Sequence, residues 1–305
     1  LVPGTVAHTE IRYVLPMHGL LIVFASTAMD RIFGRRFSRM KTDSNPLPRE
    51  MMEHTYPILF RVEQSHWWYI GRRKIIAGFV EDICGRVTDR RPRILDVGCG
   101  TGANLLLLSK YGDAEGVDVS EDALAFCRER GLDKVRLGAG EDLPYDDATF
   151  DLVTAFDVVE HMDDDLAGLS EMRRVLRPGG RVLLFVPTFM FLWGLQDEVS
   201  NHRRRYRLPQ LRRVLEQAGF EVERMTYANI TFFLPILMIR KLMRLTGIRT
   251  STENSINVPA LNGILGRLFG TESRILRQMN LPFGVSGLCV ARVSAAKVPP
   301  VKSES

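Results

Sequence analysis

The sequence predicts an α/β fold in which the strands of one open sheet alternate with helices. Residues 94–97 form a short apolar run, as expected of a strand that is buried on both faces. Gly98, Gly100 and Gly102 follow it at alternate positions, and a helical pattern then begins within three residues. A strand, a glycine turn and a helix form the arrangement with which an open α/β sheet receives a nucleotide-like ligand. We therefore expect a ligand pocket at this turn.

Six further segments have the length and apolar character of strands, and segments with helical spacing separate them. The expected strands are residues 115–119, 135–137, 150–155, 181–186, 221–226 and 286–293. The expected helices are residues 105–111, 121–130, 166–176, 209–218, 230–239 and 261–281. Ser120 is placed to cap the second of these helices. The Arg-Pro-Gly-Gly sequence at residues 177–180 predicts a turn before the fifth strand.

The length and composition fit one domain with additions. The chain has 305 residues, of which 45% are hydrophobic and 25% charged, both ordinary for a globular protein. Its net charge of +5 permits anionic partners without identifying one. The four cysteines are scattered and form no CxxC pair, so we expect neither a disulfide framework nor a resident metal ion. We expect a cytoplasmic protein, at most in contact with the inner face of the membrane.

The two ends of the chain are predicted to differ from the main domain, residues 46–293. Residues 1–45 read as a leader, and three interpretations stay open: a non-essential leader, a membrane anchor, or an extra packed helix. Residues 294–305 have the composition of a disordered tail. The His-Trp-Trp sequence at residues 66–68 either forms a lid over the pocket or packs an N-terminal helix onto the sheet.

The acid-x-Gly-x-Gly-x-Gly pattern from Asp96 to Gly102 resembles the first motif of class I S-adenosylmethionine (SAM) methyltransferases. The Leu-Arg-Pro-Gly-Gly sequence that ends at Gly180 is similar to a second motif of that family. The resemblance covers about residues 71–228 and the last strand. It implies a Rossmann-like, seven-stranded mixed sheet whose last strand is antiparallel, with helices on both faces. Helical additions are then expected at the N-terminus and at residues 227–284, between strands six and seven, where they would cap the acceptor.

The same resemblance implies SAM as the cofactor and points to a set of binding residues. Asp118 ends the second strand, where a carboxylate can accept hydrogen bonds from both ribose hydroxyls. Glu141 and Asp142 are the candidates for the adenine contact, because Ala139 stands where relatives carry an acid. The full expected set is Asp96, Gly98, Cys99, Gly100, Gly102, Asp118, Val119, Glu141, Asp142 and Asp157.

Two histidines are candidate general bases. The Asp157-Val-Val-Glu160-His161 sequence resembles a segment of small-molecule and quinone-type methyltransferases. His161 is therefore either a base, a helix cap that lines the SAM pocket, or, with Asp157 and Glu160, a ligand of a divalent metal. His202 is the second candidate base. The arginines that follow it at residues 203–207 either bind an acidic acceptor or form a solvated turn.

These patterns favour transfer of a methyl group from SAM to a small-molecule or lipid-linked acceptor, with O-methylation preferred. Two alternatives are an NAD(P)-dependent oxidoreductase, which would need G-x-G-x-x-G spacing, and a non-catalytic membrane-associated protein of the same fold. Nucleic acid is an unexpected acceptor, because the sequence after the fourth strand lacks the motifs of DNA methyltransferases. The apolar run at residues 230–239, followed by Arg240, Lys241 and Arg244, predicts a helix that lies against a membrane surface or over a lipid-like acceptor, close to the pocket. The competing prediction is a helix packed into the core.

Overall fold

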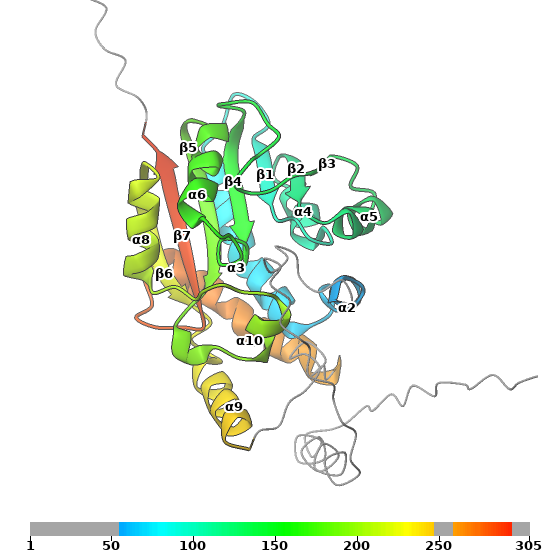
Figure 1. Ribbon diagram of the computed structural model, residues 1–305, viewed down its shortest axis with the longest axis vertical. Helices are drawn as coiled ribbons and strands as arrows, with labels where there is room; N and C mark the ends of the chain where they lie inside the picture. Colours follow the sequence, from blue (N-terminus) through cyan, green and yellow to red (C-terminus); the bar gives the residue numbers. More distant parts are fainter. Residues whose placement is uncertain (1–54, 247–258, 295–305) are drawn as a thin grey trace, which may run out of the picture.

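The computed structural model describes residues 55–246 and 259–294, which form one sheet with helices packed against both of its faces (Figure 1). The expectations for the leader at residues 1–45 and for the tail beyond residue 294 lie outside these described residues.

All seven expected strands are present. They are β1 (Arg93–Val97), β2 (Asp113–Asp118), β3 (Val135–Leu137), β4 (Phe150–Phe156), β5 (Leu176–Pro187), β6 (Phe220–Ala228) and β7 (Ser286–Val293). The helices that precede β4 are α2 (Thr55–Val62), α3 (Trp67–Cys84), α4 (Ala103–Leu108) and α5 (Glu121–Glu129). Those that follow it are α6 (Asp165–Val175), η1 (Met190–Leu192), α7 (Leu195–Val199), α8 (Leu208–Gln217), α9 (Phe233–Thr246) and α10 (Pro259–Gln278).

The strand order is β3-β2-β1-β4-β5-β7-β6, and β7 runs antiparallel to both of its neighbours. The chain leaves β1 toward β2 on one side and reaches β4 on the other, so the order reverses between β1 and β4. Open α/β sheets bind ligands in the crevice outside the carboxyl ends of the strands at such a point. The predicted mixed sheet with an antiparallel last strand and helices between strands six and seven is confirmed.

The start of β5 differs from the prediction. Leu176 already pairs with β4, and regular pairing resumes only at Arg181. Residues 177–180 therefore form an irregularity inside the strand and do not make a separate turn before it. Gly179, at φ +79°, supplies the left-handed backbone conformation that this irregularity needs.

The sheet is buried on both faces, which explains the continuous apolar runs in its strands. Along β5, Val182 and Leu184 face the helices α6 and α8. Leu183 and Phe185 face the opposite layer, which α3, α4, α5 and α10 form. The alternation of side chains along a strand thus fills two cores at once, and none of these four side chains is exposed.

Helix α10 lies along α3 at a very short distance. A Cβ atom at Gly71 would stand 2.3 Å from Phe269, so only glycine permits this approach. The ring of Trp68 packs 5.5 Å from Phe269, and the ring of Trp67 packs 4.5 Å from Phe232. Neither tryptophan lines the pocket described below. The aromatic pair therefore packs the N-terminal helix onto the insertion between β6 and β7, and the lid interpretation is wrong for these two rings.

Helix α9 extends beyond the ends of the strands, at the bottom of Figure 1. Phe233 is buried against Leu192 and Val285 at its start. Leu234, Met238 and other apolar side chains on its outer side are exposed. Within residues 55–246 and 259–294, no helix has the length and apolarity needed to cross a bilayer.

Candidate active site

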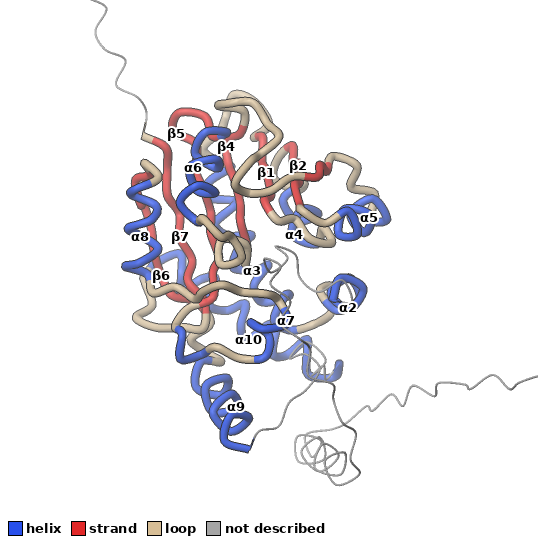
Figure 2. Tube along the Cα trace, in the orientation of Figure 1, coloured by secondary structure: helices blue, strands red, loops and turns tan. Residues whose placement is uncertain are grey.

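A pocket lies at the carboxyl ends of β1, β2 and β4, where the strand order reverses. Its floor is the loop after β1, and its walls come from α2, α3 and the loop after β4. Gln196 of α7 adds a contact from a part of the chain far along the sequence. Figure 2 shows α2 and α7 beside this end of the sheet. The location is the one that the glycine turn predicted.

The glycine loop is held in a conformation that other residues rarely adopt. Gly98 and Gly100 have φ of +65° and +53° and both line the pocket. A Cβ atom at Gly98 would stand 2.5 Å from a methyl carbon of Val158, whereas one at Gly100 would meet no atom within 4 Å. Gly100 thus leaves its backbone open to a ligand. Gly102, at φ +88°, begins α4 and does not line the pocket, so its position is structural.

Asp118 connects the end of β2 to the glycine loop. Its Oδ2 accepts a hydrogen bond from the backbone N–H of Gly100 at 2.8 Å, and its Oδ1 accepts one from Ser120 at 3.1 Å. Asp118 and Val119 both line the pocket. Ser120 caps α5, as predicted, by accepting a hydrogen bond from the N–H of Ala123. The carboxylate therefore stands in a fixed position beside the glycine loop.

Asp96 lies beneath the loop and does not line the pocket. Only 1% of it is exposed, and one carboxylate oxygen accepts a hydrogen bond of 2.6 Å from the hydroxyl of Thr154. The other oxygen has no hydrogen-bond partner within the described part of the chain. Burial raises the pKa of Asp96 to about 7, although the Thr154 hydrogen bond and the charge of Arg72 act in the opposite direction.

An ion pair crosses the pocket. Arg72 of α3 reaches the carboxylate of Asp157, and both residues line the pocket. Asp157 follows β4 directly and has φ +57°, an uncommon backbone conformation for a residue other than glycine. The sequence analysis identified Asp157 but missed Arg72. The arginine-rich start of the helix after the tryptophans was the signal that could have indicated it.

The N-terminal helix α2 also belongs to the pocket. Tyr56 and Leu59 contribute to its wall. Glu63 follows this helix and accepts hydrogen bonds from the hydroxyl of Thr101 in the glycine loop and from Arg130. Burial raises the pKa of Glu63, although these two donors act against that change. No motif marks residues 55–63, so the sequence analysis missed this contribution.

The two candidates for the adenine contact separate in the structure. Glu141 lines the pocket, together with the backbone of Gly138 and Gly140. Asp142 is exposed and lies outside the pocket lining. Of the expected cofactor residues, Gly98, Cys99, Gly100, Asp118, Val119, Glu141 and Asp157 line the pocket.

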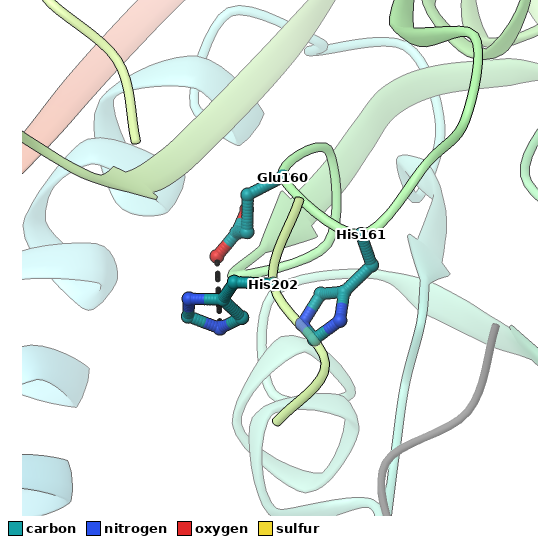
Figure 3. Close-up of side chains that lie close together, drawn as sticks. All are labelled: Glu160, His161 and His202. Atoms are coloured by element: carbon teal, nitrogen blue, oxygen red, sulfur yellow. Dashed lines mark ion pairs between the residues drawn. The ribbon is translucent and has the colours of Figure 1, made fainter. Parts of the chain in front are cut away.

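The two candidate bases come together, but only one faces the pocket. Figure 3 shows His161 and His202 beside Glu160, with ring centroids of the two histidines 4.6 Å apart. His161 lines the pocket, and His202 does not. The cap of α6 is Asp164, which accepts a hydrogen bond from the N–H of Ala167 at 2.9 Å, so the capping role expected of His161 is wrong.

Burial is the largest cause of the pKa shifts of His161 and Glu160. It lowers the pKa of His161 to about 3, and the neighbouring His202 and Arg203 act in the same direction. Burial also raises the pKa of Glu160, and the negative charge of Asp157 adds to this effect. His161 is consequently a neutral imidazole at physiological pH, which can accept a hydrogen bond but is a weak proton acceptor.

The arginines after His202 form ion pairs with nearby carboxylates. Arg205 is buried, and its Nε and Nη2 donate to the carboxylate of Asp197 at 2.7 and 3.0 Å. Arg203 pairs with Asp163 at 3.1 Å. The turn is therefore not a solvated basic segment, and its buried guanidinium is already neutralised by Asp197. The expectation of a solvated turn is therefore wrong, and Arg205 is already paired with Asp197, eight residues earlier in the chain.

Residues 95–184 match the family model described as "Methyltransferase domain". A protein of Mycolicibacterium smegmatis named "Probable S-adenosylmethionine-dependent methyltransferase" is 32% identical over 192 residues, which cover 60% of this chain and 71% of that protein. This chain belongs to the SAM-dependent methyltransferases. The alternatives of an NAD(P)-dependent oxidoreductase and of a non-catalytic protein are thereby overturned. Membership of this family implies SAM as the methyl donor.

Two other methyltransferases are similar over shorter stretches. The uncharacterized methyltransferase YcgJ of Bacillus subtilis is 34% identical over 152 residues, covering 45% of this chain and 58% of YcgJ. The crystal structure of YcgJ aligns with a TM-score of 0.45 at 21% identity, over 70% of this chain and 97% of that structure. The demethylmenaquinone methyltransferase of Staphylococcus aureus is 39% identical over 117 residues, 34% of this chain and 48% of that enzyme. The chain spans about half the length of these two relatives.

Proposed function

We propose that this methyltransferase transfers the methyl group of SAM to a hydroxyl of a small or lipid-linked acceptor at the pocket between β1 and β4. The observation that carries the proposal is the position of Asp118, whose carboxylate is fixed by Gly100 and Ser120 at the mouth of an open glycine loop. A carboxylate held in this way can accept hydrogen bonds from two neighbouring ribose hydroxyls.

The Arg72–Asp157 ion pair suits the amino-acid part of SAM. That part carries one carboxylate and one ammonium group, and the pair offers one cation and one anion inside the same pocket. Glu141 lies where it can reach the adenine. Bound SAM supplies an activated methyl group on its sulfonium, so the protein has mainly to hold the acceptor oxygen in line with it.

His161 lines the pocket, and we place the acceptor beside it. As a neutral imidazole it can accept a hydrogen bond from the acceptor hydroxyl and orient the oxygen. The S–CH₃ bond breaks as the O–CH₃ bond forms, and the hydroxyl proton leaves to solvent because His161 is too weak a base to retain it. We assign this positioning role to His161 and none in the pocket to His202. The S. aureus relative is named a demethylmenaquinone methyltransferase, and this name supports an apolar, quinone-type acceptor.

An apolar acceptor fits the exposed apolar surface on and around α9. On α9, Leu234, Met238 and Leu245 are 63%, 70% and 76% exposed. Phe191 and Phe283 continue this surface on either side of Phe233, at ring distances of 6.3 and 5.1 Å. Helix α9 contains no acidic residue, and Lys241 is exposed on it. We propose that this surface contacts an anionic lipid bilayer from which the acceptor is taken.

Binding and transfer with labelled SAM test the proposed activity. Replacement of Asp118 by alanine should weaken SAM binding by about 1.5–3 kcal/mol, the scale of a lost charged hydrogen bond. Asp122→Ala, an exposed acid four residues later, is the matched control and should bind SAM normally. The proposal is wrong if calorimetry shows no SAM binding by the wild type, or if Asp118→Ala binds as tightly as Asp122→Ala.

Flotation with anionic vesicles tests the lipid contact. The Leu234→Glu, Met238→Glu double variant should lose vesicle binding, since it places two charges on the exposed face, and should keep its SAM affinity. Leu106→Glu with Leu166→Glu alters exposed leucines on α4 and α6 and should bind vesicles like the wild type. The lipid proposal fails if the wild type does not bind vesicles. It also fails if the α9 variant loses its thermal transition, because the substituted face would then be part of the packed structure.

A further inference from the structure

Glu160 occupies a position that needs an explanation. It is completely buried, and neither of its carboxylate oxygens has a hydrogen-bond partner within residues 55–246 and 259–294. A buried carboxylate loses its hydration, and this loss costs free energy unless donors or a cation replace the water. Nothing in the cofactor contacts described above uses this side chain. The site therefore indicates a ligand with positive charge.

Two imidazoles stand around the same carboxylate (Figure 3). His202 Nε2 lies 3.8 Å from Glu160 Oε1, and one nitrogen of His161 completes a group whose ligand atoms all lie within 4.8 Å of one another. Metal–ligand bonds of about 2.0–2.2 Å allow two ligand atoms to stand at most about 4.4 Å apart. Small rotations of the side chains would close the remaining gap. The three residues come from two separate segments, the loop after β4 and the turn after α7.

The second contact of His202 orients it for coordination. Its Nδ1 lies 2.8 Å from Oδ1 of the buried Asp197, and Nε2 is left facing Glu160. Asp197 is itself fixed by Arg205 and by the backbone N–H of Gly194. A carboxylate that holds the distal nitrogen of a histidine is the usual arrangement behind a metal-ligating imidazole. This observation is independent of the unpartnered glutamate.

We propose that Glu160, His161 and His202 bind one divalent ion of a first-row transition metal. Two imidazole nitrogens and one carboxylate oxygen form a donor set that suits Zn²⁺ and leaves coordination positions open. This set differs from the group of Asp157, Glu160 and His161 that the sequence suggested. The carboxylate of Asp157 is already paired with Arg72, and His202 takes its place. Since His161 lines the pocket, the bound ion would take over from this imidazole the contact with an acceptor oxygen, because the one lone pair of a neutral imidazole cannot serve both. Only this last point rests on the proposed function.

Calorimetric titration of the chelator-treated full chain with ZnCl₂ tests the site, and the visible spectrum of added Co²⁺ reports its coordination. We expect one ion per chain. Glu160→Gln and His202→Ala should each weaken binding at least 100-fold, and Asp197→Asn should weaken it about 10-fold through the orientation of His202. Glu216→Gln, which removes an exposed carboxylate from α8, is the matched control and should bind like the wild type.

Folding of the variants is checked by their SAM affinity, because neither Glu160 nor His202 lines the SAM pocket. The proposal is overturned if folded wild type binds neither Zn²⁺ nor Co²⁺, which would leave Glu160 and His202 as a simple ion pair. It is equally overturned if Glu160→Gln binds the ions unchanged. A chain that binds SAM but no metal refutes this inference alone, whereas one that binds Zn²⁺ but not SAM refutes the proposed function.

Discussion

The two sides of the pocket are built by different means. On the side that we propose for the cofactor, hydrogen bonds to backbone N–H groups fix the carboxylate of Asp118 between Gly100 and Ser120, and the Arg72–Asp157 ion pair stands beside them. On the side that we propose for the acceptor, buried charges make the decisive contacts. Asp197 pairs with Arg205, lies 3.7 Å from Arg240 of α9 and orients His202. The first side depends on backbone conformation, and the second depends on charge balance within one loop.

The difference predicts that the acceptor side can be disrupted without harm to the cofactor side. Asp197→Ala leaves Arg205 buried without its partner, and such a loss typically costs about 3–5 kcal/mol. Although burial raises it, the hydrogen bond from His202 and the charge of Arg205 hold the pKa of Asp197 below its usual range. We expect urea unfolding to show this loss of stability. The SAM affinity of the folded variant, measured without urea, should change little.

The double variant Asp197→Ala, Arg205→Met is the control for this largest effect. It removes both charges and should recover part of the lost stability, because no buried guanidinium is left unpaired. A loss below about 1 kcal/mol for Asp197→Ala, or an equal loss of SAM affinity, would show that the two sides are not independent.

On the cofactor side, the buried carboxylate of Asp96 forms no ion pair with a guanidinium in the described part of the chain and should give the opposite pH dependence. Its pKa rises from 3.8 to about 7, so the folded protein holds a proton that the unfolded chain releases. The contribution of Asp96 to stability should therefore fall as the pH rises from 4 to 7, by up to about 4 kcal/mol. Asp96→Asn should remove this contribution and be the more stable protein at pH 8, as measured by urea unfolding at several pH values.

The Asp96 effect is separable from that of His161, whose pKa is lowered to about 3. A histidine with a lowered pKa makes stability rise with pH between about 3 and 6.5, since the unfolded chain takes up the proton there. The Asp96→Asn variant keeps that rise and loses only the fall. If the free energy of unfolding changes with pH between 4 and 7 equally in Asp96→Asn and in the wild type, the carboxylate of Asp96 does not cause the predicted pH dependence.

The same contrast explains what the sequence could predict. The strands, the glycine loop, the Ser120 cap and the position of Asp118 follow from short-range patterns, since each depends on residues within a few positions of one another. The roles of Arg72 and Glu63 could not be predicted, because they depend on contacts with Asp157 and Thr101 across the fold.

The acceptor side was predicted least well. The run of arginines after His202 has the composition of a solvated turn, and that composition does not show that the turn folds back onto Asp197, eight residues before Arg205, and buries the pair. Helix α9 shows most clearly what the sequence could not predict. The sequence placed Arg240 at a membrane surface, but this residue is only 8% exposed and its guanidinium donates to the carbonyl of Leu192. The position of a charge along a helix does not determine which side of that helix is buried.

The smallest expected effect separates the two basic residues of α9 for which the structure gives side-chain positions. Lys241 is exposed beside the apolar face, and Arg240 is buried against η1 and α7. On anionic vesicles, Lys241→Gln should weaken binding by about 1 kcal/mol, which is about fivefold, because each basic side chain near such a surface contributes on that scale. Raising the salt concentration should remove the difference between variant and wild type, since screening acts on exposed charges.

Arg240→Gln should instead lower the thermal stability and leave the salt dependence of vesicle binding unchanged. Neutral vesicles serve as the control, on which Lys241→Gln should bind like the wild type. Equal salt dependence of wild type and Lys241→Gln would mean that α9 meets no anionic surface, and the acceptor side would then have to be explained by its buried charges alone.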